Sequence, residues 1–193
     1  MKQRTEQILV FGILVTACVG LRFYFQTIPN FAPVAAVALF AGYFFQSRWL
    51  AVLTPVTAMA ISDQFTGAYQ PILMATVYTC LAVPALLGAP LRQKLNHRGP
   101  IASSLTLFSC SLASSLLFFT ATNLATWLVT PWYPRTIAGL TQCLVNAVPF
   151  FRYTLMGDLF FAAALFGSYA VIRQLATSSQ PPLASNRLAA QKG

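Results

Sequence analysis

The sequence predicts an all-α integral membrane protein with six transmembrane helices, and three observations support this prediction. Hydrophobic residues make up 57% of the 193 residues and charged residues only 8%, against about 25% in an average soluble domain. This composition cannot cover a small soluble domain with polar groups, which excludes an ordinary globular enzyme and a disordered chain. Six apolar stretches follow one another along the chain, and positive charges are distributed unevenly between the breaks.

Each apolar stretch is a candidate membrane span, because a helix needs about 20 apolar residues to cross the hydrocarbon core. The second and third stretches are shorter than the others, and the fifth is the longest. In chain order the stretches are 8–25, 31–45, 49–61, 71–91, 101–129 and 150–175. They assign residues 1–176 to a single transmembrane domain. The remaining residues, 177–193, are rich in Ser, Pro, Ala and Gln and predict a flexible cytoplasmic tail.

The breaks between these stretches carry turn signals. Proline marks the breaks at 26–31 and 130–149, glycine marks the polar gap at 62–70, and the break at 92–100 is basic. If the N-terminus is cytoplasmic, nine of the twelve Lys and Arg residues lie inside and three lie outside. This bias predicts that both termini are cytoplasmic and that 26–31, 62–70 and 130–149 are external.

The net charge of +9 is therefore an orientation signal, and the lipid bilayer is the expected partner. No basic stripe with interleaved aromatic residues occurs, so nucleic acid is not an expected partner. The sequence has no P-loop, G-x-S-x-G or H-E-x-x-H motif, which argues against an ATPase and a common hydrolase. Its four cysteines are widely spaced and its histidine is single, so neither a zinc site nor a disulfide framework is predicted.

Polar residues inside the spans are the informative ones, because they are costly in a membrane. Asp158 in the sixth span either forms a helix-packing hydrogen bond or serves a functional site. Asn123 needs several partners, which an outward-facing polar cavity would supply. Thr76 and Cys80 share one face of the fourth helix, and Cys80 lies roughly 14 Å along it from Pro71, near the middle of the bilayer. A thiol there is usually an inert packing group, so its role stays open at this point.

Several short motifs resemble the substrate-binding (S) components of energy-coupling-factor (ECF) vitamin transporters, over about residues 22–176. They are the NFAPVAA run at 30–36, Ser62 with Asp63, Thr122 with Asn123, the YPRT run at 133–136 with Gly139 and Leu140, the PFFR run at 149–152, and Gly157 with Asp158. With Cys80 in the fourth helix, the chain resembles the BtuM-type solitary vitamin B12 uptake proteins in particular.

This resemblance implies a six-helix S-component bundle in a bacterial inner membrane. It implies that cobalamin is the ligand, enters from the periplasmic side, and is bound through its cobalt by Cys80. Thiolate sulfur is a soft donor that suits a transition metal, and its donation should weaken the ligand on the opposite face of the corrin. We therefore expect Cys80 to promote decyanation of cyanocobalamin, with a reductant needed to close a catalytic cycle. Whether the protein is an enzyme or only a transporter stays open.

The pocket for such a ligand should be wide, aromatic and rich in hydrogen-bonding groups. The candidate contacts are Tyr24, Asn30, Phe31, Asp63, Phe65, Tyr69, Gln70, Thr76, Tyr78, Asn123, Trp127, Tyr133, Arg135 and Arg152.

The resemblance also implies an ECF coupling and ATPase module as a partner, or none in the solitary type. The Ala-x-x-x-Ala surface of S components is replaced in the first helix by Gly12, Thr16 and Gly20, a small-residue stripe that still permits close helix contact. Three alternatives remain: an S-component-like transporter for another vitamin with Cys80 merely packed, a membrane thiol-redox protein, and a structural membrane subunit.

Overall fold

The computed structural model describes residues 2–67, 70–96 and 99–178, and within these ranges every regular element is an α-helix. The all-helical class is therefore confirmed for the described part of the chain. The helices are α1 (Lys2–Tyr24), α2 (Val34–Phe44), α3 (Arg48–Thr66), α4 (Pro71–Asn96), α5 (Pro100–Val129) and α6 (Ile137–Ser178).

Four of the six helices, α1, α4, α5 and α6, are long and apolar enough to cross a membrane. Helix α2 is apolar but has 11 residues, so it is roughly 16 Å long, about half the thickness of the hydrocarbon core. Helix α3 has 19 residues, but polar side chains such as Ser62 and Asp63 lie in its last turns. Several long apolar helices are compatible with a multi-pass membrane protein.

The structure corrects the predicted start of the last span. Residues 130–149 were expected to form an external connection, but α6 begins at Ile137 and continues through Pro149. The side-chain oxygen of Thr136 accepts a hydrogen bond from the backbone N–H of Gly139 (3.1 Å), which satisfies a donor at the helix start. Helix α3 likewise extends into the predicted gap at 62–70. Of the predicted tail, residues 177 and 178 belong to α6, and 179–193 lie outside the described residues.

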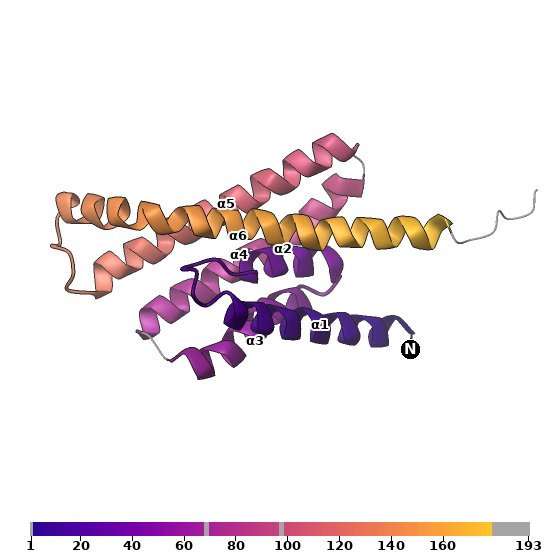
Figure 1. Cartoon of the computed structure of the whole chain (residues 1–193), viewed down its shortest axis with the longest axis horizontal. Coiled ribbons are helices and arrows are strands. Elements are labelled where there is room, and N and C mark those ends of the chain that lie inside the picture. The colour runs from indigo at the N-terminus through magenta and orange to yellow at the C-terminus, as the bar shows by residue number, and fades with distance from the viewer. Residues whose placement is uncertain (1, 68–69, 97–98, 179–193) are drawn as a thin grey trace, which may run out of the picture.

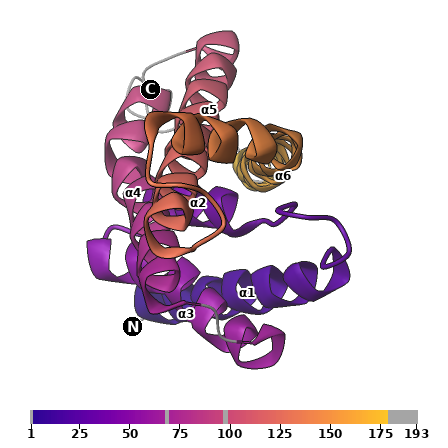
Figure 2. The same cartoon turned by 90° about the vertical axis from the view of Figure 1, so that its left-hand side faces the viewer.

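Successive helices run in opposite directions, with α1, α3 and α5 pointing to one end of the molecule and α2, α4 and α6 returning (Figure 1). Helix α2 lies in the middle and packs against α3, α4 and α6. Helices α1 and α3 lie on one side of it, and α5 and α6 lie on the other (Figure 2). The side chains of Leu39 and Phe45, at and just after α2, are almost completely buried.

Helices α2 and α4 cross at two glycines. A Cβ added to Gly42 would collide with the backbone carbonyl of Ala85, and one added to Gly88 would collide with the backbone of Gly42. Glycine at such a crossing lets helix backbones approach closely, as is common between membrane helices. This crossing fixes α4 against the central helix, with its Val77–Leu81 turn beside the connection between α1 and α2.

Candidate functional site

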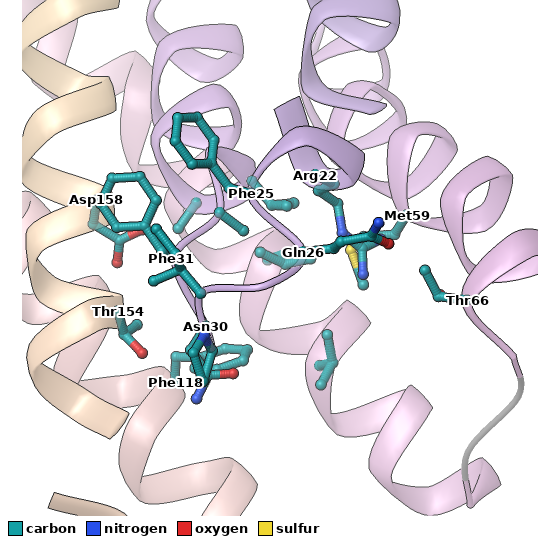
Figure 3. A pocket seen from close by; sticks show the side chains of 17 residues that line it. Arg22, Phe25, Gln26, Asn30, Phe31, Met59, Thr66, Phe118, Thr154 and Asp158 are labelled. Carbon is teal, nitrogen blue, oxygen red and sulfur yellow. The ribbon is translucent and has the colours of Figure 1, made fainter. Parts of the chain in front are cut away.

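A cavity of about 400 Å³ lies beside the connection between α1 and α2. This volume is near the lower end of the roughly 300–1,000 Å³ typical of small-molecule sites. Figure 3 shows Asp158 and Thr154 on one side of the cavity, Arg22 and Met59 on the other, and the connection between them. Its lining consists of Arg22, Phe25, Gln26, Ile28, Pro29, Asn30, Phe31, Ala32, Val34, Ala35, Met59, Thr66, Val77, Leu81, Phe118, Thr154 and Asp158.

Aromatic contacts hold the connection against α6. The Phe31 ring lies 5.0 Å from the Phe25 ring and 5.4 Å from the Phe161 ring, measured between centroids. Gly157 leaves room for this approach, because a Cβ there would come within 3.3 Å of the backbone nitrogen of Ala32. Asn30 adopts a left-handed backbone conformation with φ of 59°, which asparagine tolerates better than most residues and which turns the chain into α2.

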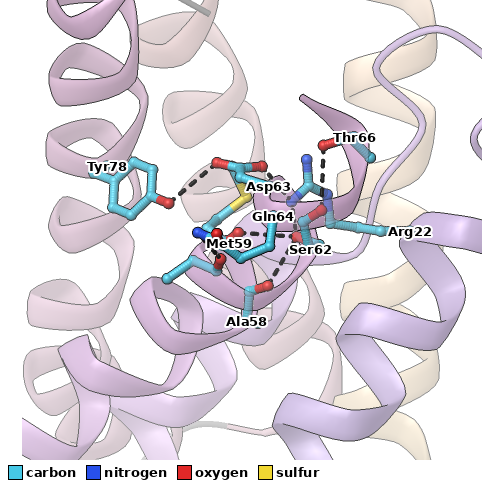
Figure 4. A network of polar contacts seen from close by, with 9 residues as sticks. Arg22, Ala58, Met59, Ser62, Asp63, Gln64, Thr66 and Tyr78 are labelled. Carbon is cyan, nitrogen blue, oxygen red and sulfur yellow. Dashed lines mark hydrogen bonds and ion pairs between the residues drawn. The ribbon is translucent and has the colours of Figure 1, made fainter. Parts of the chain in front are cut away.

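A closed polar network joins α1, α3 and α4 at the edge of the cavity (Figure 4). Arg22 Nη1 donates to Asp63 Oδ1 at 3.1 Å and also to Ser62 Oγ. Tyr78 Oη donates to Asp63 Oδ2 at 3.1 Å. Both carboxylate oxygens of Asp63, whose side chain is 4% exposed, therefore have a partner, and its charge is balanced by Arg22. Such pairing is what makes a buried carboxylate tolerable.

A second polar contact joins α5 and α6. Ser115 Oγ donates to Asp158 Oδ2 at 2.6 Å, with the carbonyl of Ser111 as a longer alternative acceptor at 3.0 Å, and both Ser115 and Asp158 are buried. The predicted helix-packing hydrogen bond of Asp158 is therefore present. Asp158 also lines the cavity, and in the described part of the chain no cationic side chain lies within ion-pair distance of it. The carboxylate is thus held by a neutral partner only.

Cys80 is 8% exposed and is not part of the cavity lining. Val77 and Leu81 line the cavity, and on an ideal helix Cys80 is rotated by about 60° from the first and about 100° from the second. Thr76 lies on the far side of Cys80 and lines a separate apolar groove between α4 and α5. All four cysteines are free. Within the described ranges no group of three His, Cys, Asp or Glu side chains is arranged to hold a metal ion.

Four of the residues singled out in the sequence lie at the cavity or next to it. Asn30 and Phe31 belong to the lining, whereas Asp63 and Tyr78 form the neighbouring network with Arg22. Tyr69 lies outside the described residues.

The other residues predicted to contact the ligand are not part of the cavity lining. Exposed positions are occupied by Tyr24, Gln70, Arg135 and Arg152. Phe65 packs edge-on against Phe23, with ring centroids 5.8 Å apart. Asn123 satisfies its amide within α5, donating from Nδ2 to the carbonyl of Phe119 at 2.7 Å rather than into a polar cavity.

The loop between α5 and α6 gathers the remaining polar and aromatic candidates. Trp127 Nε1 donates to the carbonyl of Pro134 at 2.9 Å, and the Arg135 guanidinium lies 5.9 Å from the Trp127 ring. Tyr133 Oη accepts from Asn146 Nδ2 at 3.4 Å. These contacts stabilise the loop itself and lie apart from the cavity lining.

No local sequence pattern indicates that one polar region contains Arg22, Ser115, Thr154 and Asp158. Arg22 and Asp158 carried a usable signal, since an ionisable group at or inside a membrane span is expected to face a cavity or a partner. Their presence in the same lining depends on how α1 and α6 pack around α2, which no local pattern reveals.

Comparison with known proteins yields a family but no characterised relative. No curated protein and no solved structure matches the sequence. The sequence model of a family of unknown function, DUF6580, matches residues 2–181, nearly the whole chain. The chain therefore belongs to the DUF6580 family.

Proposed function

We propose that the protein binds cobalamin and takes it up across a bacterial inner membrane, with the Cys80 thiolate as a ligand of the corrin cobalt. The observation that carries this proposal is the position of Cys80 in α4, between Val77 and Leu81. Both of these neighbours line the cavity, and the Cys80 side chain lies next to the lining rather than in it. The S-component resemblance supplies the ligand. A single cysteine suffices here, because the metal arrives already held by the corrin nitrogens.

The arrangement of the helices supports six membrane crossings in the manner of an S component. Successive helices alternate in direction, and the start of α1 and the end of α6 lie at the same end of the molecule (Figure 1). With the positive charges inside, that end is cytoplasmic. The cavity lies beyond Arg22, near the opposite end of α1, and therefore opens toward the outer side. The short helix α2 crosses together with the turn-rich connection that precedes it.

A corrinoid is larger than the cavity, so binding requires the connection between α1 and α2 to move outward. Its backbone hydrogen bonds support this, because they run locally, from Gln26 to Phe23, Ile28 to Phe25 and Phe31 to Ile28. Gln26 and Asn30 are exposed, so moving them away costs little buried area. The aromatic cluster around Phe31 is the contact that must open.

The proposed reaction is a ligand substitution at Co(III). The Cys80 sulfur donates an electron pair to the lower face of cobalt as the nucleotide base leaves it, and cyanide departs from the upper face with the electron pair of its bond. The thiol proton leaves with cyanide as HCN, so this single exchange changes no oxidation state and leaves sulfur bound to cobalt. Freeing the thiol for a second round requires the reductant expected from the sequence. Soft thiolate donation favours this exchange.

A coupling module is the proposed partner for release into the cytoplasm. Gly12 and Gly20 on α1 face open space, since a Cβ added to either would meet nothing within 4 Å. This small-residue stripe supports contact with a partner helix. The alternative is the solitary type that the sequence also resembles, which has no such partner.

The test is the visible spectrum of the purified protein after addition of cyanocobalamin. We expect a stoichiometric corrin band whose maximum shifts in Cys80→Ala, together with loss of cyanide release. Cys143→Ala is the matched control, because Cys143 is also a buried helical cysteine but lies on α6, where its thiol contacts the carbonyl of Asn123 on α5. A wild-type protein that binds no corrinoid, or a Cys80→Ala variant that releases cyanide at the normal rate, would overturn the proposal.

A further inference from the structure

We propose that Asp158 is the specificity-determining acceptor of the cavity and that it receives an N–H group from a peripheral carboxamide of the corrinoid. This inference rests on the proposed function and names the contact by which the site selects its ligand. It begins from a difference between two buried carboxylates that share one neighbourhood.

The two carboxylates differ in how completely the protein satisfies them. Asp63 uses both oxygens, one for Arg22 and one for Tyr78. Asp158 uses Oδ2 for Ser115, and its Oδ1 has no hydrogen-bond partner in the described part of the chain. Every fully buried side-chain oxygen or nitrogen in the described residues does have a partner. Oδ1 is therefore reachable from outside the protein, and the open space that Asp158 lines is the cavity.

The surroundings of Asp158 favour a hydrogen-bond donor supplied from outside the protein. Phe31 and Phe118 supply apolar wall on the same cavity, and in such surroundings an acceptor without a donor is costly. An ionised carboxylate accepts hydrogen bonds and donates none. Thr154, one turn before Asp158, makes a long 3.5 Å contact from Oγ1 to the carbonyl of Phe150 and forms no hydrogen bond with Asp158. The missing donor is thus expected from the ligand.

The chemistry of the donor follows from the ligand class. A corrinoid is surrounded by carboxamide side chains, each of which offers two N–H groups. A corrinoid in which one carboxamide is hydrolysed to a carboxylate presents an anion instead. Facing Asp158, that anion removes a hydrogen bond and adds repulsion between like charges. Asp158 therefore selects the amidated ligand over its acidic counterpart.

The experiment measures dissociation constants for cyanocobalamin and for each monocarboxylate isomer of it, by spectral titration of the purified protein. Wild type, Asp158→Asn and Asp158→Leu are compared. Glu6→Gln is the matched control, because it removes the same charge from an exposed position on α1. We expect Asp158→Leu to weaken binding of cyanocobalamin about tenfold or more, the usual worth of a hydrogen bond to a charged group.

The isomers provide the sharper readout, which does not depend on the leucine variant folding. We expect at least one isomer to bind wild type about tenfold more weakly than cyanocobalamin, and Asp158→Asn to abolish that penalty. Glu6→Gln should leave it unchanged. If wild type binds cyanocobalamin but no isomer's penalty changes in Asp158→Asn, Asp158 does not select the ligand and the inference is overturned alone. If wild type binds no corrinoid, the proposed function falls with it.

Discussion

Two buried carboxylates, 95 positions apart in the sequence, differ in how completely the protein supplies their hydrogen-bond and charge partners. Asp63 is balanced by Arg22 and by Tyr78, so the network that joins α1, α3 and α4 is closed. Asp158 receives one hydrogen bond from Ser115, and its second oxygen is open to the cavity. Burying a charge without a counter-charge is costly. The paired site of Asp63 therefore stabilises the helix bundle, whereas Asp158 is suited to accept a hydrogen bond from a ligand.

The two carboxylates are expected to have different roles, Asp63 in the stability of the fold and Asp158 in ligand binding. Substitutions in the closed network should act mainly on the free energy of unfolding. Substitutions at Asp158 should act mainly on ligand affinity. Four variants test this division, and each is measured by reversible denaturant unfolding of the purified protein in detergent.

The largest effect is expected for Arg22→Met. This substitution leaves Asp63 buried without its counter-charge, so the free energy of unfolding should fall by about 3 kcal/mol or more. The double variant Arg22→Met with Asp63→Leu should recover part of the loss, because it removes the stranded charge. If Arg22→Met alone has the same free energy of unfolding as wild type, the closed network does not stabilise the fold as proposed.

A smaller loss is expected for Tyr78→Phe. The variant keeps the ring and removes the hydroxyl that donates to Asp63 Oδ2 at 3.1 Å. A hydrogen bond to a charged group is worth about 1.5 kcal/mol, and we expect a decrease in unfolding free energy of that size. Tyr133→Phe is the control, because its hydroxyl lies in the exposed loop between α5 and α6 and accepts only a long 3.4 Å bond.

Ser115→Ala should cost less than Tyr78→Phe. Hydrogen bonds between membrane helices contribute on average about 0.6 kcal/mol, and the loss of the Ser115 hydroxyl should lower the unfolding free energy by a similar amount. Ser109→Ala is the matched control, since Ser109 lies on α5 and donates only within its own helix. A loss as large as that of Arg22→Met would show that the Ser115–Asp158 contact is a main structural link.

The smallest stability effect is expected for Asp158→Asn. The amide keeps an oxygen that accepts from Ser115, and the substitution removes a buried charge that has no counter-charge. The unfolding free energy should therefore stay within about 0.5 kcal/mol of wild type or rise. A loss above about 2 kcal/mol would place Asp158 with Asp63 among the structural carboxylates and would blur the distinction between the two regions.

Much of the architecture could be predicted because its causes are local. Apolar stretches of helical length and the turn residues between them indicate helices directly, and the break around Pro29 and Asn30 coincides with the connection between α1 and α2. The start of α6 could not be predicted in this way. Pro149 resembles a break in the sequence, but the structure carries it inside a helix that begins at Ile137.

The candidate site was predictable only in part. Asn30 and Phe31, two of the candidate contacts, line the cavity from the connection between α1 and α2. The sequence predicts several partners for the Asn123 amide in a polar cavity, and the structure gives its Nδ2 one partner, the Phe119 carbonyl of its own helix. An amide on a helix can always bond to the preceding turn, so its presence in a span does not by itself locate a cavity.

The all-helical class, the apolar character of the long helices and the positions of the basic segments follow from the sequence alone, because each depends on composition and near-neighbour pattern. Which polar side chains meet depends on the tertiary packing of the helices. Arg22 and Asp63 are 41 positions apart and Ser115 and Asp158 are 43 apart. Their pairing follows from the packing of α1 with α3 and of α5 with α6 around the central helix. Sequence separation carries no information about such distances, so the closed network and the open carboxylate became visible only in the folded chain.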